Sequence, residues 1–223
     1  MKSKKLSRNK KIGYIVIGVS LFAILFLILG KASYEKRTNE ELTSKERELL
    51  LKMNRDLNEF KNKEPEDISK DSVFYPVHKS EITQKLLEKA LRKTALENNA
   101  KSFIKAEDRY GINAIFLLAI ANHESAFGTS RIAQEKNNLF GFNAVDSDPY
   151  NGASGFKDLN QGILEVAKKI KKLYLDDDGK YFNGYSAFGM NKNYSSDPDW
   201  AAKVNEHMVM IVEKILDFYQ IDY

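Results

Sequence analysis

An uninterrupted apolar run near the N-terminus is the strongest constraint in this sequence. Residues 12–29 read IGYIVIGVSLFAILFLIL and contain no charged side chain. As an α-helix this run would be about 27 Å long, close to the ~30 Å hydrocarbon core of a bilayer. The sequence therefore predicts one transmembrane helix over residues 12–29.

The charges around this run predict its orientation. Six of the 35 Lys and Arg residues lie within residues 1–11, where there is no Asp or Glu, whereas the C-terminal flank carries both signs. Because basic flanks stay inside, we expect residues 1–11 to form a cytoplasmic tail and the rest of the chain to lie on the outer, cell-wall face of the cell membrane. The alternative is a signal peptide cleaved before Ser33, although the run is longer than the usual hydrophobic region of such peptides. In both interpretations the chain that follows the apolar run lies outside the cytoplasm.

Composition excludes several kinds of chemistry. Beyond residue 11 the chain carries 29 basic and 31 acidic residues, without the basic excess expected of a nucleic-acid-binding protein. Cys is absent, which rules out disulfides, thiolate metal sites and Cys nucleophiles. His123-Glu124 begins like a zinc-protease motif, but Phe127 stands where the second His would be. We therefore expect no metal and no cofactor.

Residues 30–79 are polar and predict a stalk or linker. Thr43-Ser44-Lys45-Glu46 has the spacing of a helix-capping box. Apolar side chains then follow one narrow helical stripe: Leu49, Leu50, Met53, Leu57 and Phe60. We expect a helix of about twenty residues that acts as a spacer from the membrane. The alternative is a helix that binds a partner.

Residues 80–223 predict a compact, mainly helical domain. Amphipathic patterns near 82–91 and 100–106 precede residues 112–121, which are apolar on nearly every face and should form the buried central helix. Further helices are expected over 130–135, about 158–175 and 200–218. Short aromatic segments at 138–142 and 153–156 flank a polar loop, which predicts a small β-hairpin.

Glu124 lies where the apolar central helix ends. Desolvation and the negative end of the helix both favour a neutral carboxyl group, so its pKa should be raised. A carboxylic acid of this kind can protonate a glycosidic oxygen. The alternative is a Glu that is simply paired with a nearby cation.

Two motifs resemble those of the glycoside hydrolase family 73 N-acetylglucosaminidases. Residues 121–130 read ANHESAFGTS and are followed by NNLFG at 137–141, and residues 194–204 read YSSDPDWAAKV. With the apolar segment and spacer ahead of them, they are similar to the membrane-anchored SagB-type cell-wall glucosaminidases of Gram-positive bacteria. The resemblance implies a lysozyme-like α+β fold, in which an α-lobe and a small β-hairpin lobe enclose a groove for peptidoglycan.

The resemblance also implies site residues. Glu124 matches the catalytic Glu of the family, and Tyr194 matches its active-site Tyr. For a second carboxylate the polar loop offers Asp146, which we favour, and Asp148, although both can equally cap turns. Glu135 and Asp158 are more distant candidates. The side chains expected to contact the substrate are Asn138, Phe140, Phe142, Asp148 and Tyr150.

The sequence thus predicts a membrane-anchored peptidoglycan hydrolase. It would be an endo-β-N-acetylglucosaminidase that cleaves the GlcNAc-β-1,4-MurNAc bond with Glu124 as the general acid. Its expected partners are peptidoglycan strands and the lipid bilayer, with a polytopic membrane protein as a plausible addition and no nucleic acid. The alternatives are a lytic transglycosylase or muramidase on the same substrate, and a non-catalytic wall-binding or scaffold protein.

Overall fold

The computed structural model describes residues 42–62, 68–145 and 147–221. Residues 43–223 form one compact unit, and the regular secondary structure of its described residues is helical. The predicted tail and transmembrane helix, residues 1–29, lie outside the described residues. In the part of the chain that is described, none of the helices has the length and apolar character needed to cross a bilayer.

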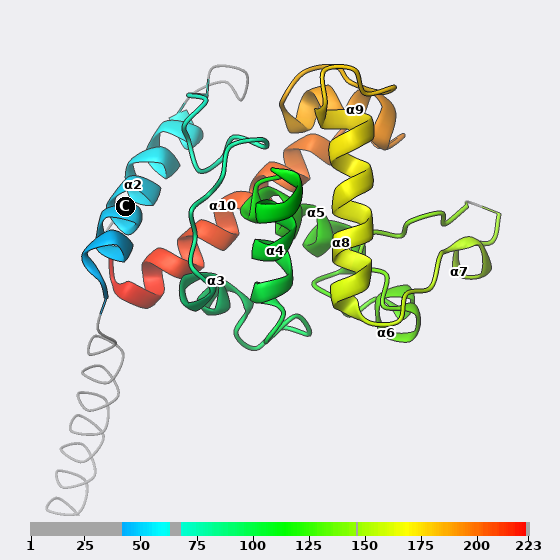
Figure 1. Ribbon diagram of the computed structural model, residues 1–223, viewed down its shortest axis with the longest axis horizontal. Coiled ribbons are helices and arrows are strands. Elements are labelled where there is room, and N and C mark those ends of the chain that lie inside the picture. Colours follow the sequence, from blue (N-terminus) through cyan, green and yellow to red (C-terminus); the bar gives the residue numbers. More distant parts are fainter. Residues whose placement is uncertain (1–41, 63–67, 146, 222–223) are drawn as a thin grey trace, which may run out of the picture. The chain divides into compact units, whose positions relative to one another are not determined.

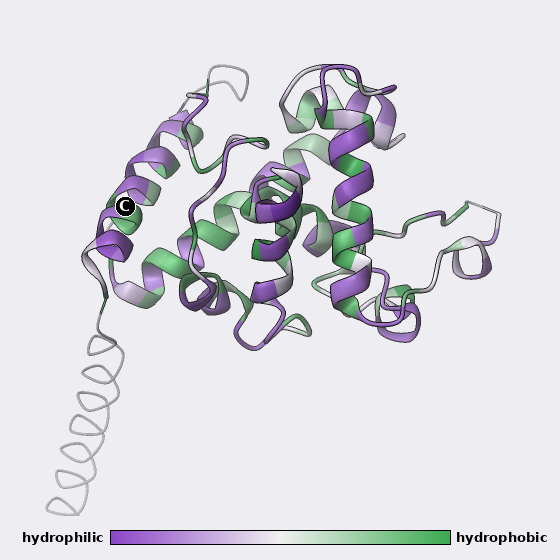
Figure 2. Ribbon diagram, in the orientation of Figure 1, coloured by the Kyte–Doolittle hydropathy of each residue, from purple (hydrophilic) through white to green (hydrophobic). Residues whose placement is uncertain are grey.

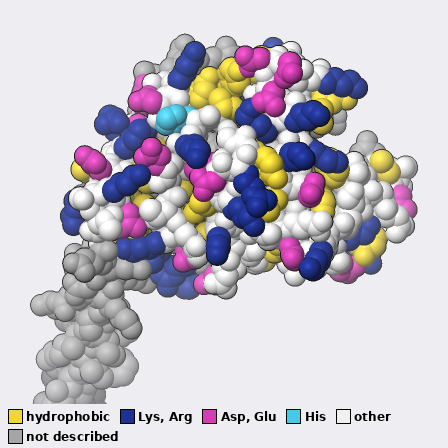
Figure 3. Space-filling model, viewed as in Figure 1, with side chains coloured by type: hydrophobic (Ala, Val, Ile, Leu, Met, Phe, Trp, Pro, Cys, Tyr) yellow, Lys and Arg dark blue, Asp and Glu magenta, His cyan; other side chains and the backbone are white. Residues whose placement is uncertain are grey.

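Figure 1 colours the chain by its sequence and labels the α-helices. The helical elements are α2 (Ser44–Asn62), α3 (Gln84–Leu91), α4 (Ala100–Tyr110), α5 (Ala114–Ser125), α6 (Arg131–Lys136), α7 (Pro149–Gly152), α8 (Leu159–Ile170), the π-helical turn η2 (Lys171–Leu175), α9 (Ala187–Tyr194) and α10 (Trp200–Tyr219). The face drawn in Figure 3 carries Lys and Arg intermingled with Asp and Glu, in keeping with the near-equal numbers of the two charges after residue 11.

The first helix of this unit, α2, packs against the domain. Leu50, Met53 and Leu57 are 0 % exposed, and α2 contacts α10. The capping box forms as predicted, because Thr43 N donates to Glu46 Oε2 (3.0 Å) and Glu46 N donates to Thr43 Oγ1 (3.1 Å). The predicted spacer over residues 30–79 is therefore corrected from Thr43 onward: its apolar stripe is covered by the chain's own helices.

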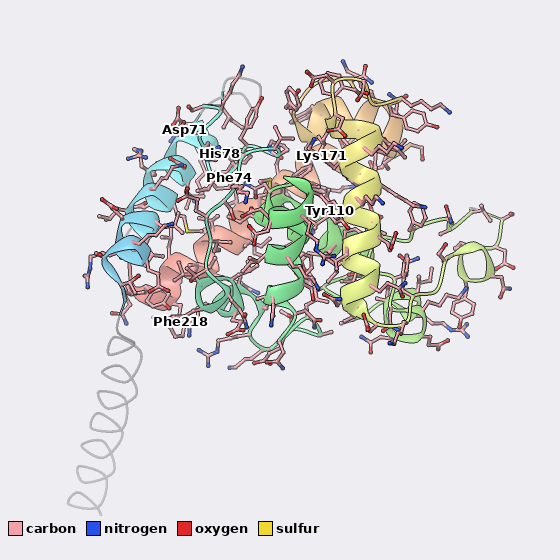
Figure 4. The ribbon with its side chains drawn as sticks, in the orientation of Figure 1. Asp71, Phe74, His78, Tyr110, Lys171 and Phe218 are labelled. Atoms are coloured by element: carbon pink, nitrogen blue, oxygen red, sulfur yellow. The ribbon has the colours of Figure 1, made fainter. Side chains whose placement is uncertain are left out.

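Two buried carboxylates of α2 fix it to the segments that follow. Glu46 accepts a hydrogen bond from Thr83 Oγ1 (3.1 Å) at the start of α3. Asp56 accepts one from Val73 N (3.0 Å). Phe74, labelled in Figure 4, stacks on Phe60 of α2 with ring centroids 4.2 Å apart. Polar and apolar contacts thus both join α2 to the rest of the unit.

The central helix is α5, as predicted. Residues 114–121 are all 0 % exposed, and α5 packs against α10 and α4. Hydrophobic colouring marks both α5 and α10 in Figure 2. At its N-terminus, Asn113 Oδ1 accepts from Ile115 N (2.9 Å), and buried Glu107 accepts from Ala114 N (2.7 Å). These bonds satisfy backbone N–H groups that a helix start leaves unpaired.

The predicted β-hairpin is a loop. In residues 42–62, 68–145 and 147–221 the one β contact is an isolated bridge between Val145 and Asp148. Lys136, Asn137 and Asn138 instead donate side-chain hydrogen bonds to backbone carbonyls between residues 142 and 157. Because side chains satisfy these carbonyls, the aromatic segments need no strand ladder, and the chain between them makes the short helix α7.

Replacing Leu50 with Ala should test whether α2 belongs to the domain. A fully buried Leu→Ala change typically lowers the free energy of unfolding by about 2–5 kcal/mol. The neighbouring Leu51 is 58 % exposed, so Leu51→Ala should change it by less than about 0.5 kcal/mol. Urea denaturation of both variants measures the difference. Equal, small effects would mean that α2 is a detached stalk.

Candidate active site

A cleft with a volume of about 440 Å³ lies beside the C-terminal end of α5. Glu124 lines it together with residues 140–144, residues 194–196, and one face of α8 and η2 formed by Val166, Lys169, Ile170, Leu173 and Tyr174. Among the described residues that line the cleft, Glu124 is the only Asp or Glu. The end of the central helix therefore borders this cleft.

Glu124 is held by a neutral partner. Its Oε1 accepts a hydrogen bond from Trp200 Nε1 (2.8 Å) at the start of α10. Burial raises the pKa of Glu124 above its ordinary value of 4.5, and this effect outweighs the Trp200 hydrogen bond and nearby His123, which both lower the pKa. The side chain therefore holds its proton to higher pH than a solvated Glu, as a general acid requires.

The chain reverses sharply just after Glu124. Ala126, Phe127 and Gly128 all have left-handed backbone angles, with φ of 49°, 60° and 81°. Ser125 is 0 % exposed, and its hydroxyl accepts a hydrogen bond from Gly128 N (2.8 Å). Left-handed non-glycine residues cost about 1–3 kcal/mol each and persist only where surrounding contacts enforce them. The tight turn thus fixes the position from which Glu124 projects.

Tyr194 stands in an aromatic cluster next to Glu124. Its ring lies 4.7 Å from the Trp200 ring and 5.4 Å from the Tyr174 ring, measured between centroids. Burial, followed by the negative charge of Glu124, raises the pKa of Tyr194 well above its ordinary value. Its hydroxyl group therefore keeps its proton at physiological pH and can donate a hydrogen bond into the cleft.

In the described residues, none of the candidates for a second carboxylate lines the cleft with Glu124. Asp146, the one we favour, lies outside the described residues. Asp148 caps α7 and accepts hydrogen bonds from Asn151 N (3.2 Å) and Asn151 Nδ2 (2.8 Å). The side-chain bond from Asn151, followed by the backbone bond, lowers the pKa of Asp148. Asp148 therefore has the turn-capping role that the sequence offered as its alternative.

Only some of the predicted substrate-contacting side chains line the cleft. Phe140 and Phe142 line the cleft with Glu124. Asn138 is 1 % exposed, and its amide donates hydrogen bonds to the carbonyls of Phe142 and Ser154. It therefore stabilises the loop behind the cleft and does not line the cleft itself.

Tyr150 belongs to a separate exposed group. Its hydroxyl donates to Glu135 Oε2 (2.6 Å), and the Arg131 guanidinium lies 4.0 Å from its ring centroid. Tyr150 is not among the residues that line the cleft, and neither is Glu135.

Some residues in or next to the cleft were not predicted from the sequence. Lys169 comes from α8, whereas Leu173 and Tyr174 come from η2, which follows it directly. The sequence predicts a helix over about 158–175 but gives these residues no role in a site. Trp200 is the single Trp of the chain and lies in the motif near Tyr194. Its rarity was the available signal, but no spacing rule connects it to Glu124, 76 positions away.

Comparison with known proteins gives a consistent result. The pattern of the Glucosaminidase family, described as mannosyl-glycoprotein endo-beta-N-acetylglucosaminidase, matches residues 100–211. A putative endo-beta-N-acetylglucosaminidase of Streptococcus pneumoniae is 45 % identical over 125 residues, which are 56 % of this chain and 19 % of that protein. The beta-N-acetylglucosaminidase of Bacillus subtilis is 29 % identical over 184 residues, covering 70 % of this chain and 20 % of that protein. The chain thus spans about a fifth of the length of these relatives.

Solved structures support the fold. A catalytic mutant of Staphylococcus aureus autolysin E, in complex with the disaccharide NAG-NAM, overlaps with a TM-score of 0.52 at 24 % identity, covering 75 % of this chain and 79 % of that one. The lysozyme-like helical fold is therefore confirmed, without the predicted β-hairpin. Because the family pattern spans half of the sequence and includes both Glu124 and Tyr194, the chain belongs to the glucosaminidase family of glycoside hydrolases.

Proposed function

We propose that this chain is an endo-β-N-acetylglucosaminidase that hydrolyses the GlcNAc-β-1,4-MurNAc bond of peptidoglycan. The observation that carries the proposal is Glu124, a carboxyl group with a raised pKa at the edge of a cleft large enough for sugar rings. The names of the relatives and the disaccharide bound to autolysin E support the same reaction and the same class of substrate.

The first step follows from the position of the Glu124 proton. The neutral carboxyl donates this proton to the glycosidic oxygen as the bond to the anomeric carbon breaks. Positive charge then builds on the sugar ring that remains in the cleft. The ionised Glu124 stabilises this positive charge by its own negative charge. The hydroxyl of Tyr194 can orient the sugar by a hydrogen bond to one of its oxygens.

A second group must stabilise that ring or activate water. We propose Asp146 for this role, because in the sequence it closely follows residues 140–144, which line the cleft. The alternative is the acetamido oxygen of the substrate itself, which some glycosidases use in place of a second carboxylate. This alternative is favoured because Glu124 is the only Asp or Glu among the described residues that line the cleft. A variant of Asp146 distinguishes the two possibilities.

We further propose that residues 12–29 anchor the chain in the cell membrane, with residues 1–11 in the cytoplasm and the hydrolase on the cell-wall face. The uncharged apolar run and the one-sided basic flank support this arrangement. An anchor would keep the cleft close to the bilayer and to any polytopic membrane protein that acts on the same strands.

Replacing Glu124 with Gln should lower kcat on purified peptidoglycan by about 10²–10⁴-fold, because the amide cannot donate the proton. New ends released by the unmodified chain should carry reducing N-acetylglucosamine. Glu88→Gln on α3 is the matched control and should leave the rate unchanged. Reducing-end MurNAc would identify a muramidase, and 1,6-anhydro ends a lytic transglycosylase.

Asp146→Asn belongs to the same series. A loss of comparable size supports Asp146 as the second carboxylate. Full activity in this variant would assign the role to the acetamido group of the substrate. If Glu124→Gln retained full activity, the hydrolase proposal would fail and a wall-binding protein would remain.

The Trp200→Phe variant tests how the acid is tuned. The Trp200 N–H stabilises the ionised carboxylate, so removing it should raise the pKa of Glu124 further. Because the reaction needs the protonated form, kcat/KM falls as pH rises through this pKa, and the alkaline limb of the profile should move to higher pH. A shift to lower pH would contradict the assignment of Glu124 as the acid.

Cell fractionation tests the anchor. The intact chain should sediment with membranes, resist extraction by high salt and dissolve in detergent. External protease added to wall-free cells should remove the domain. A shortened chain beginning at Ser33 and released to the medium would instead identify a cleaved signal peptide.

A further inference from the structure

The cleft beside Glu124 has one basic side chain among its described residues. Lys169, exposed on α8, is the only Lys or Arg of these residues, just as Glu124 is their only Asp or Glu. Since burial raises the pKa of Glu124, its neutral form is favoured before the reaction. Until the proton is transferred, the described lining of the cleft therefore carries the positive charge of the Lys169 ammonium.

An aromatic ring holds this ammonium in the cleft wall. Lys169 Nζ lies 4.2 Å from the centroid of the Phe142 ring, which also lines the cleft. Phe142 comes from the loop that replaces the predicted hairpin, so two separate elements place the charge. An ammonium group over the face of a ring keeps N–H groups that can still donate to an anion. The contact with Phe142 therefore positions the charge without neutralising it.

No carboxylate of the described residues pairs with Lys169. Lys171, two positions further on, forms an ion pair with Asp176. In the part of the chain that the structure describes, Lys169 has no such ion pair, although Glu165 lies one helical turn before it. A cation that lines a substrate cleft and has no acidic partner in the protein is suited to an anionic group of the substrate.

The glycan of peptidoglycan has one acidic group attached directly to a sugar ring. MurNAc differs from GlcNAc by a lactyl ether, which ends in a carboxylate where the stem peptide is absent and in an amide where the stem is attached. The bond that the proposed hydrolase cleaves has MurNAc on one side. The lactyl group therefore enters the cleft together with the bond, whereas an uncharged polymer of GlcNAc brings no group that can pair with Lys169.

We propose that Lys169 is a specificity-determining residue, which binds the lactyl carboxylate of MurNAc and makes strands without stem peptides the preferred substrate. This inference rests on the proposed function and deepens it, because it names the form of the glycan that the site selects. A reaction that hydrolyses the amide bond between the lactyl group and the stem peptide must then act first, since that step exposes the carboxylate.

Three sets of glycan fragments of equal length test this proposal. The lactyl carboxylates are free in the first set, converted to neutral methylamides in the second, and joined to stem peptides in the third. The chain without substitutions should cleave the first set with a kcat/KM about tenfold higher than the second, because the methylamide cannot form the charge-assisted hydrogen bond. The appearance of new reducing ends measures the rates.

Variants of Lys169 show whether this side chain causes the preference. Lys169→Met should lower kcat/KM on the first set about tenfold, mainly by raising KM, and leave the rate on the second set unchanged. Lys169→Arg keeps the charge and should retain most of the preference. Lys168→Met is the matched control, because Lys168 is an exposed residue of the same helix that does not line the cleft. It should leave the preference intact.

Equal losses on the first two sets in Lys169→Met would mean that Lys169 only supports the cleft wall, and the proposal would be overturned. A loss confined to the stem-bearing set would overturn it as well, because the ammonium would then bind a carboxylate of the peptide.

Calorimetry in the Glu124→Gln background separates this proposal from the proposed function. There the free-carboxylate fragments should bind about tenfold more tightly than the methylamides, and adding Lys169→Met should abolish the difference. If this difference is found but the chain without substitutions cleaves none of the fragments, the proposed function alone is wrong. If the fragments are cleaved but neither rate nor affinity depends on Lys169, only the role of Lys169 is wrong.

Discussion

The burial of α5 is the constraint on which the rest of the structure depends. Its apolar residues have no solvent exposure over residues 114–121, so surrounding helices must cover every face. Where this helix ends, Glu124 is still close enough to the core to lose much of its hydration. The apolar surface that stabilises the fold therefore also raises the pKa of Glu124, the acid that we propose.

Two neighbouring groups limit how far burial raises the pKa of Glu124, so that the carboxyl can still ionise. Complete burial without a partner would make its ionised form very costly once the proton has been given up. The Trp200 indole N–H stabilises that ionised form, and His123 acts in the same direction. The pKa of Tyr194 is raised as well, first by burial and then by the negative charge of ionised Glu124. The site thus combines a proton donor that can ionise with a neighbouring hydroxyl that does not.

Much of this arrangement could be predicted from sequence, because the relevant patterns are local. The capping box at Thr43 and the helix apolar on all sides each indicate structure within a few residues. Glu124 could be found because its position relative to the end of that helix is itself a local property. The resemblance of two motifs to a known family then linked it to Tyr194.

The remainder depended on contacts between distant segments. Nothing in the stripe of α2 indicates whether a membrane spacer, a partner or the chain's own α10 covers it. The loop after α6 reads as a hairpin, but the side chains of Lys136, Asn137 and Asn138 take the carbonyl partners that a strand would need. The cleft face of α8 and the Trp200 contact likewise arise only when the helices assemble.

The most direct measurement of the central claim is the titration of Glu124 itself. The carboxyl carbon can be followed by NMR as pH is varied in the unsubstituted chain, with the Glu124→Gln spectrum used to assign its signal. Our account requires a midpoint clearly above 4.5, the ordinary value for Glu. A midpoint at or below that value would mean that the carboxyl is ionised throughout the working range, and the role of Glu124 as proton donor would be contradicted.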